Sequence, residues 1–569
     1  MKTVIVGGVA GGASAAARLR RLDEKAQIIL LERGEYISYA NCGLPYYIGG
    51  EITDKNALTL QTPESFRERF AVDVRVRHEA TAIDAARKVV LVRDVVKGKD
   101  YEESYDKLIL SPGAEPVRLP LPGMEDARIF TLRTIPDTFR IHEQIQDTRP
   151  KTAVVVGGGF IGLEMAENLT RAGVSVTVVE IMDHVIGQLD YDMACEVHSY
   201  LRHKGVGLLL GRAVKAFHPD EALLEVELDN GDILRAEMVL MSVGVRPDTA
   251  LAQRAGLKTN IRGAILVDGH MRTSDEHIYA VGDAVEVRHL VSGAPAHIPL
   301  AGPASKQGRI AADNICGIES VYRGTQGSSI LKLFELAVAS TGLNESAAKA
   351  AGLDYDKIYT HSASHATYYP GASNILIKTL FEKQTGRILG AQIVGFDGVD
   401  KRCDVFATAI RAGMTAYDLT ELELCYAPPF SSAKDPVNMA GFAIENLLTE
   451  KVRQFHWHDV ASVRENDNAL LLDVRTADEY AAGSIPGAVH IPLDSLRERI
   501  REIDRSKTLY VYCRTGIRSY IACRILSQNN FDCFNLSGGY RLYETVTDAR
   551  AFDIAPVHSC GIKIISSAG

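Results

Sequence analysis

The chain has 569 residues, of which 46% are hydrophobic and 24% are charged. This composition is typical of soluble globular proteins, and the length is enough for three or four domains with cores of their own. The formal net charge of -9 and the pI near 6.0 argue against bulk electrostatic binding to nucleic acid or to anionic membranes. We therefore expect small-molecule partners, with no nucleic acid and no membrane.

The N-terminus runs through an apolar stretch but shows no convincing cleavage site, and no run of eighteen or more apolar residues occurs elsewhere. We therefore predict a cytoplasmic, unanchored protein. The nine cysteines contain no C-x-x-C pair, so neither structural disulfides nor a metal site is expected, and a reducing compartment fits best. They occupy positions 42, 195, 316, 403, 425, 513, 523, 533 and 560.

Two copies of one pattern stand about 150 residues apart, at residues 3–18 and 153–167. Each has an apolar strand, a glycine-rich turn and a helix, and a second apolar strand then ends in an acid, Glu32 or Glu180. Glycine permits the tight turn and the close approach of a pyrophosphate, which the helix N-terminus binds, while the acid accepts hydrogen bonds from ribose. The pattern predicts two Rossmann-like nucleotide-binding domains, one for FAD and one for a nicotinamide nucleotide.

The second copy fills every position of this pattern, with Gly157, Gly159, Gly162 and Glu180. No arginine or lysine follows Glu180 directly, so we predict NADH in preference to NADPH.

The first copy is less regular. Gly7 and Gly12 fit the pattern, but Val9 stands where the middle glycine is usual, and Glu32, about twenty residues past Gly12, restores the match.

One cysteine, Cys42, lies about ten residues past the acid of the first copy, within Asn41-Cys42-Gly43-Leu44-Pro45, and no second cysteine is nearby. A redox disulfide within the chain would need two closely spaced cysteines. The oxidised form must therefore be a mixed disulfide with a small thiol, a persulfide or a sulfenic acid. A thiol close to a helix N-terminus can be held as the reactive thiolate.

The segments 105–113, 242–247 and 278–284 resemble, in the same order, those of the pyridine nucleotide-disulfide oxidoreductases. Residues 38–46 narrow the resemblance to the coenzyme A-disulfide reductases. The resemblance implies a discontinuous FAD domain (1–112 and 248–321), an NADH domain (113–247) and an α+β dimerisation domain (322–447). A linker (448–459) and a further domain (460–569) follow.

The resemblance also implies site residues. For FAD they are Gly7, Gly8, Gly11, Gly12, Glu32, Arg33, Gly113, Arg133, Asp283 and Ala301, with Asp283 on the ribityl chain. For NADH they are Gly157, Gly159, Ile161, Gly162, Glu180 and Gly244. For coenzyme A they are Arg18, Arg21, Ser38, Asn41 and Lys434, with the arginines near its phosphates.

Two tyrosines beside prolines, Tyr368 and Tyr426, match family positions that reach the active site of a partner subunit. The resemblance thus implies a homodimer or a higher homo-oligomer. A phenol at that place can donate a hydrogen bond, or a proton, to a leaving sulfur.

The last 110 residues or so resemble a rhodanese domain of α/β fold, through residues 471–475, 485–492, 513–519 and 535–539. The loop from Cys513 to Arg518 makes a six-residue cradle suited to sulfur, in which successive N–H groups and Arg518 are expected to surround the sulfur. Cys523 and Cys533 are expected in the core, and Cys560 has no assignment.

Together these features predict an FAD-dependent enzyme that uses NADH to reduce coenzyme A persulfide, polysulfide or coenzyme A disulfide at Cys42, while Cys513 carries sulfane sulfur. Two alternatives stay open. An NADH oxidase or peroxidase can cycle a single cysteine through sulfenic acid, and a redox-sensing or sulfur-sensing scaffold would bind without turnover.

Overall fold

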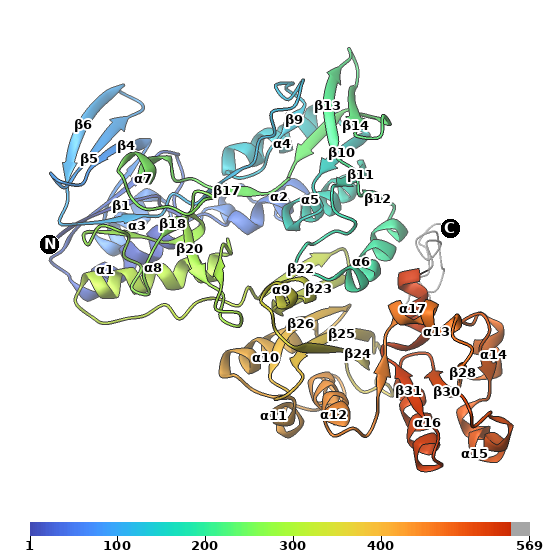
Figure 1. Ribbon diagram of the computed structural model, residues 1–569. Helices are drawn as coiled ribbons and strands as arrows, with labels where there is room; N and C mark the ends of the chain where they lie inside the picture. The colour runs from blue at the N-terminus through green and yellow to red at the C-terminus, as the bar shows by residue number, and fades with distance from the viewer. Residues whose placement is uncertain (548–569) are drawn as a thin grey trace. The chain divides into compact units, whose positions relative to one another are not determined.

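The computed structural model describes residues 1–547 (Figure 1), so Cys560 and the end of the predicted rhodanese domain lie outside the described residues. The contacts divide the chain into two compact units. The first unit holds residues 1–181 and 211–327, and the second holds residues 182–210 and, among the described residues, 328–547.

The first unit contains a five-stranded parallel sheet in the order β19-β7-β1-β2-β3. Its strands are β1 (Lys2–Val6), β2 (Gln27–Glu32), β3 (Asp73–Val76), β7 (Lys107–Leu110) and β19 (Ile278–Ala280). Apolar residues on both faces of these strands are buried, as a covered parallel sheet requires. Because β19 joins the sheet, the chain returns to its first sheet after the second nucleotide-binding pattern.

Helices α1 (Ala10–Leu22) and α8 (Ala301–Ile315) run side by side (Figure 1). Their backbones come so close that a Cβ atom on Gly308 would lie 2.3 Å from the carbonyl oxygen of Gly11. The buried face of α1 is built mainly from glycine and alanine, which is why the sequence allows this approach. The contact fixes the first turn of α1.

A second parallel sheet in the first unit contains strands in the order β11-β10-β16-β9. They are β9 (Ile129–Phe130), β10 (Thr152–Val156), β11 (Ser175–Glu180) and β16 (Met238–Met241). Helix α5 (Phe160–Arg171) follows β10, as the second glycine pattern predicts.

This unit also contains smaller sheets, one of which holds β18 (Ile265–Leu266), β20 (Val285–Arg288) and β21 (Pro295–Ala296) and pairs β18 with β20 in parallel. The others are antiparallel. They are β4 (His78–Asp84), β5 (Val89–Asp94) and β6 (Lys99–Ser104); β13 (Val214–Pro219), β14 (Leu224–Leu228) and β15 (Ile233–Ala236); and the pair β8 (Ala114–Pro116) and β17 (Val245–Pro247). The other helices are α2 (Leu44–Ile48), α3 (Pro63–Phe70), α4 (Ile135–Thr148) and α7 (Ala250–Arg254).

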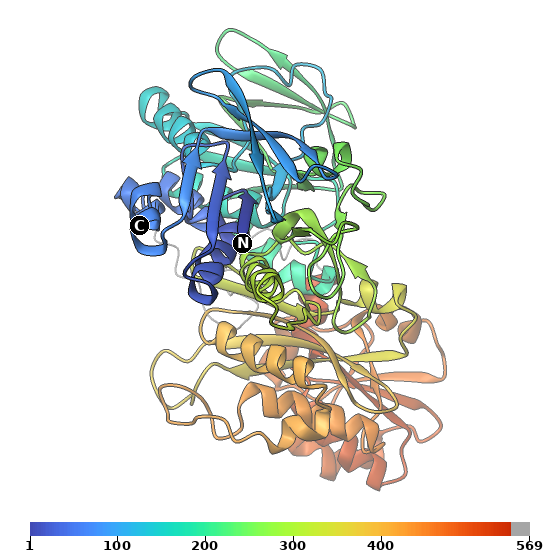
Figure 2. The ribbon, with the colours of Figure 1, turned by 90° about the vertical axis from the view of Figure 1, so that its left-hand side faces the viewer.

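The second unit contains an antiparallel sheet in the order β22-β23-β26-β25-β24. Its strands are β22 (Ser329–Leu333), β23 (Leu336–Gly342), β24 (Tyr355–Ala363), β25 (Asn374–Glu382) and β26 (Ile388–Gly395). Helices α10 (Val399–Ala412) and α12 (Pro436–Leu448) lie against this sheet (Figure 2), with α11 (Ala416–Glu421) beside α12.

A buried ion cluster fastens α6 (Tyr191–His203) to this sheet. The Nζ atom of Lys378, which is fully buried in β25, lies 2.9 Å from Asp190, 2.9 Å from Asp192 and 2.5 Å from Glu345. Burial lowers the pKa of Lys378, but Tyr359 and the carboxylates outweigh it and raise that pKa well above its ordinary value. A buried ammonium held in this way keeps α6 in one place, because separating the partners would leave a charge unpaired.

The C-terminal part of the second unit is a parallel sheet in the order β27-β31-β30-β28-β29. Its strands are β27 (Gln454–Phe455), β28 (Ala469–Asp473), β29 (Val489–His490), β30 (Thr508–Tyr512) and β31 (Cys533–Leu536), with α16 (Ile517–Gln528) and α17 (Gly539–Thr547) among its helices.

This C-terminal sheet is fastened to β24 and α6. The Tyr359 N–H donates to Ser537 Oγ at 3.2 Å, Gln454 Nε2 donates to the Lys357 carbonyl at 2.8 Å, and Trp457 Nε1 donates to Asp192 at 3.3 Å. Within residues 1–547, no helix combines the length and the apolar character that a membrane span requires.

We expect Gly308→Ala to destabilise the fold by about 1–3 kcal/mol, because the added methyl group forces α1 and α8 apart. Thermal unfolding of the protein measures this. Gly302→Ala on the same helix is the matched control, since its Cβ would meet nothing within 4 Å. Equal unfolding midpoints for the two variants would contradict the close helix contact.

Candidate active sites

The first glycine turn is closed by backbone contacts and by an acid. Gly7 has φ +95°, and a Cβ there would lie 2.1 Å from the Ser111 carbonyl oxygen. A Cβ on Gly12 would lie 1.9 Å from the Gly7 oxygen. Glu32, at the end of β2, accepts N–H bonds from Gly8 at 3.0 Å and from Gly34 at 2.9 Å.

The second turn repeats this construction. Gly157 has φ +107° and would place a Cβ 2.4 Å from the Ser242 oxygen, while Glu180 accepts the Gly158 N–H at 2.6 Å. Gly159 is different, because its φ of -78° suits any residue and a Cβ would meet nothing within 4 Å. The protein alone does not need glycine there, whereas the close approach of a pyrophosphate does.

Both helix starts leave N–H groups available to an anion. Val9 and Gly159, the residues that precede α1 and α5, provide no side-chain hydrogen bond to the first turn. A bound phosphate is a suitable partner for such groups. The residues present therefore fit a dinucleotide at each turn.

Other predicted FAD residues gather at one place. Arg133 Nη2 donates to the Pro112 carbonyl at 3.1 Å, beside Gly113, whose φ is +75°. Burial raises the pKa of Asp283, and the positive charges of His297 and Arg133 partly offset that rise.

Two further predicted FAD residues have clear surroundings. Arg33 pairs with Asp248 at 2.7 Å, and Ala301 begins α8, which also lacks a side-chain cap.

The predicted NADH residues Ile161 and Gly244 are accessible. The Ile161 side chain in the first turn of α5 is 38% exposed, and Gly244, with φ +114°, has open space where a Cβ would stand. The structure adds Arg212, which is exposed and whose N–H donates to the Glu180 carbonyl at 3.0 Å. Sequence reasoning missed this cation because it lies far from Glu180 along the chain.

Cys42 lies in a single 3-10 turn, Asn41–Gly43, directly before α2. Both Asn41 and Cys42 are exposed. Loss of hydration raises the pKa of Cys42, and the carboxylates of Glu164 and Asp283 raise it further. The expected effect of the helix N-terminus is therefore outweighed, since α2 is only five residues long, and the chain by itself favours the thiol.

A pocket of about 380 Å³ lies on the first unit, and one of its lining residues, Ser38, stands four residues before Cys42 in the sequence. Its walls include the predicted coenzyme A contacts Arg21 and Ser38, together with Gln61, Phe66, Phe70 and Arg309.

Arg18 is not among the lining residues of this pocket, because its Nε pairs with Asp313 of α8 at 2.6 Å. Sequence reasoning missed Arg309, which α8 brings to α1 from the far end of the first unit.

The two predicted tyrosines meet in the second unit. The hydroxyl groups of Tyr368 and Tyr426 are 3.0 Å apart, and the residues are 74% and 50% exposed. The hydrogen bond raises the pKa of Tyr368. Lys434 is exposed just before α12. A paired, accessible set of phenols is suited to proton donation.

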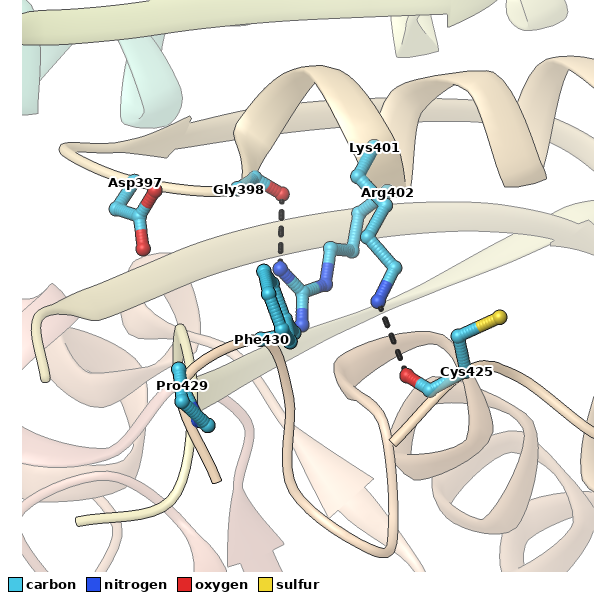
Figure 3. Close-up of a pocket in the computed structure, with 7 residues that line it drawn as sticks. All are labelled: Asp397, Gly398, Lys401, Arg402, Cys425, Pro429 and Phe430. Carbon is cyan, nitrogen blue, oxygen red and sulfur yellow. Dashed lines mark hydrogen bonds between the residues drawn. The ribbon is translucent and has the colours of Figure 1, made fainter. Parts of the chain in front are cut away.

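Figure 3 shows the pocket of about 350 Å³ beside the Tyr426 segment. Lys401 Nζ donates to the Cys425 carbonyl at 3.4 Å, and Arg402 Nη1 donates to the Gly398 carbonyl at 3.1 Å. Arg402 also pairs with Asp435 at 2.9 Å and is buried. These bonds hold the chain on either side of the tyrosine.

The Cys513 loop follows β30 and precedes α16, as the sequence predicts. Cys513 is fully buried, and its sulfur accepts the Gly516 N–H at 3.1 Å and the Ser519 hydroxyl at 3.3 Å. These donors stabilise negative charge on sulfur.

Arg518 binds a carboxylate and stays near the loop. Its two terminal nitrogens bind Glu479 at 2.7 Å each, and Arg518 is close enough to Cys513 for their charges to interact. The hydrogen bond from Arg518 lowers the pKa of Glu479 to about 2. Sequence reasoning missed Ser519 as the donor, although it stands next to Arg518. Cys523 and Cys533 are buried in the core, which confirms that prediction.

Residues 1–308 match the pyridine nucleotide-disulphide oxidoreductase family, residues 328–436 match its dimerisation domain, and residues 457–545 match the rhodanese-like domain. The chain belongs to the pyridine nucleotide-disulphide oxidoreductases. This confirms the predicted α/β fold class with a dimerisation domain and a C-terminal rhodanese domain. The family implies FAD and NAD(P)H as cofactors and a homo-oligomer.

Three relatives narrow the comparison. A coenzyme A disulfide reductase of Staphylococcus aureus is 35% identical over 78% of this chain and 99% of its own. Reduced CoADR-RHD of Bacillus anthracis is 48% identical, covers 96% of this chain and 98% of its own, and has a TM-score of 0.94. An NAD-dependent persulfide reductase from A. fulgidus is 38% identical, covers 96% and 100%, and has a TM-score of 0.89. The chain is thus a flavin-dependent pyridine nucleotide-disulphide oxidoreductase with a dimerisation domain and a C-terminal rhodanese-like domain.

We expect Ser519→Ala to slow sulfur transfer from thiosulfate about tenfold, because it removes one of the two hydrogen bonds to the Cys513 sulfur. Sulfide or thiocyanate release from the full-length enzyme measures this. Ser527→Ala, on the exposed face of the same helix, is the matched control and leaves the rate unchanged. A rate for S519A equal to that of the control would remove Ser519 from the site.

Proposed function

We propose that this enzyme uses NADH to reduce coenzyme A persulfide, polysulfide or coenzyme A disulfide through Cys42, and that its rhodanese domain delivers sulfane sulfur through Cys513. The observation that supports the proposal is that one chain contains two thiols in different surroundings. Cys42 is exposed and has no partner cysteine among the described residues, and Cys513 sits in a cradle of donors to sulfur.

Coenzyme A fits the pocket that contains Arg21 and Arg309. Two guanidinium groups suit its phosphates, and the rings of Phe66 and Phe70 suit its apolar and aromatic parts. Ser38 lines the same pocket and stands four residues before Cys42. A ligand held there by its phosphates can extend its sulfur toward Cys42.

When bound, FAD supplies two-electron transfer between NADH and the sulfur at Cys42. The Cys42 thiolate attacks the outer sulfur of a coenzyme A persulfide, the S–S bond of the substrate breaks, and coenzyme A leaves as its thiolate. Cys42 is left as a persulfide, and two electrons return it to the thiolate with release of hydrosulfide. The Tyr368 and Tyr426 pair, from the partner subunit of a homodimer, provides the proton for the leaving sulfur.

NADH is the proposed nucleotide because Glu180 stands where the ribose hydroxyls of the adenosine half bind, and a carboxylate repels a 2′-phosphate. Arg212, whose N–H donates to the Glu180 carbonyl, is a nearby cation that acts against this preference.

We expect NADH oxidation to be fastest with a sulfur substrate when coenzyme A disulfide, coenzyme A persulfide, polysulfide and hydrogen peroxide are compared at steady state. Peroxide or oxygen turnover that exceeds every sulfur substrate would instead support the oxidase or peroxidase. No turnover with any of them would support the sensing scaffold.

Substitution of each thiol tests the division of labour. Cys42→Ser is expected to abolish NADH-linked sulfur reduction while the protein keeps its FAD absorbance. Cys513→Ser is expected to leave direct reduction of coenzyme A persulfide within about twofold of wild type and to block transfer from thiosulfate. Equal loss of direct reduction in both variants would contradict separate roles and indicate one obligatory relay.

Removal of either pocket arginine tests the coenzyme A site. We expect Arg21→Ala and Arg309→Ala each to raise KM for coenzyme A disulfide about tenfold with little change in kcat, because each removes a charge-assisted contact with phosphate. Polysulfide, which lacks phosphate, serves as the control substrate, and Arg262→Ala at an exposed position serves as the control variant. Equal KM values for coenzyme A disulfide in all three variants would place coenzyme A elsewhere.

A further inference from the structure

Helix α2, which begins two residues after Cys42, packs against α5 of the second nucleotide-binding sheet. The contact is close, because a Cβ on Gly49 would lie 2.0 Å from Asn168 Oδ1. Within it, the Tyr46 hydroxyl donates to Glu164 Oε1 at 3.5 Å. The helix that follows the nucleophile is therefore seated on a glutamate that the proposed mechanism does not use.

Glu164 stands in an acidic stretch of this contact. Arg171 pairs with Glu167 at 3.0 Å and with Glu51 at 2.7 Å, and Glu167 is fully buried. Glu164 makes no ion pair within the part of the chain that the structure describes. Burial and the neighbouring Glu167 raise the pKa of Glu164 to about 7, although the hydrogen bond from Tyr46 opposes this.

The same carboxylate acts on Cys42. After loss of hydration, the charge of Glu164 is the largest cause that raises the pKa of the Cys42 thiol. Asp283 acts in the same direction, and His297 and Arg133 face it. From α4, His142 packs on the ring of Tyr47 at 5.0 Å between centroids.

We propose that Glu164 is a positioning residue that sets the pH at which Cys42 becomes a nucleophile, by carrying or releasing a proton beside it. The neutral acid permits the Cys42 thiolate, and the ionised form opposes it. The two groups thus share one negative charge and titrate as a coupled pair. This inference rests on the nucleophilic role proposed for Cys42.

The direction of the pH dependence follows from the sign of the charge that Glu164 carries when it is ionised. Below about pH 7 Glu164 is protonated and exerts no charge on Cys42. As the pH rises through this value Glu164 ionises, and the added negative charge delays ionisation of the thiol. Reactivity of Cys42 should therefore rise less steeply above pH 7 than that of an isolated thiol.

Alkylation of the FAD-loaded, full-length enzyme by iodoacetamide tests this, with the Cys42 peptide quantified by mass spectrometry from pH 5.5 to 9.5. Glu164→Gln is expected to alkylate at Cys42 roughly three- to tenfold faster at pH 8, since removal of a nearby like charge lowers a thiol pKa by up to about one unit. Cys425 is exposed and belongs to the second unit, so its alkylation in the same sample is the internal reference.

Two further variants separate charge from structure. Tyr46→Phe removes the hydrogen bond that favours the ionised Glu164 carboxylate. The pH above which Glu164 opposes ionisation of Cys42 should therefore be higher in this variant. Glu24→Gln, an exposed surface acid, should leave the profile unchanged. An unchanged Cys42 profile in E164Q would overturn the proposal, and so would equal acceleration at Cys42 and Cys425.

The alkylation measurement does not depend on any sulfur substrate. A shifted Cys42 profile in E164Q supports the role of Glu164 even if the wild-type enzyme turns over none of the sulfur compounds, which would overturn only the proposed function. An unshifted profile in an enzyme that reduces coenzyme A persulfide overturns only this inference.

Discussion

Both predicted nucleotide sites depend on the same hydrogen bond, in which an acid at the end of one strand accepts an N–H of a neighbouring glycine turn. Glu32 makes it with Gly8, and Glu180 makes it with Gly158. In each case the carboxylate holds a turn that needs glycine. The helix that follows has no side-chain cap at its start. The rest of the site is arranged around the two open helix ends, because the groups that bind phosphate are backbone groups whose direction the turn determines.

The two thiols proposed to react lie in different surroundings. Cys513 is buried, and its sulfur accepts hydrogen bonds from Gly516 and Ser519. Cys42 is exposed, and loss of hydration together with the charges of Glu164 and Asp283 raises the pKa of its thiol. This difference is consistent with the two roles proposed for them, a carrier of sulfane sulfur at Cys513 and a nucleophile at Cys42.

Features with local causes could be predicted from the sequence, and features with distant causes could not. The glycine turns and the Cys513 loop are short patterns whose residues act on their own neighbours, so their placement was correct. The ion pair of Arg18 with Asp313, almost three hundred residues away, could not be predicted from the sequence. Arg309 and Arg212 likewise reach their positions only through long-range packing. The raised pKa of Cys42 was missed because its causes, loss of hydration and then the charges of Glu164 and Asp283, come from residues far away in the sequence.

The rhodanese domain has a second consequence for the molecule. Strand β24 is at the edge of its antiparallel sheet, and its Tyr359 amide donates to Ser537 Oγ of the C-terminal domain. An open row of amides at a sheet edge is a template for pairing with another chain, and proteins usually shield it. The rhodanese-like domain thus covers part of the edge of the dimerisation domain's sheet, and a chain shortened before that domain would expose this edge.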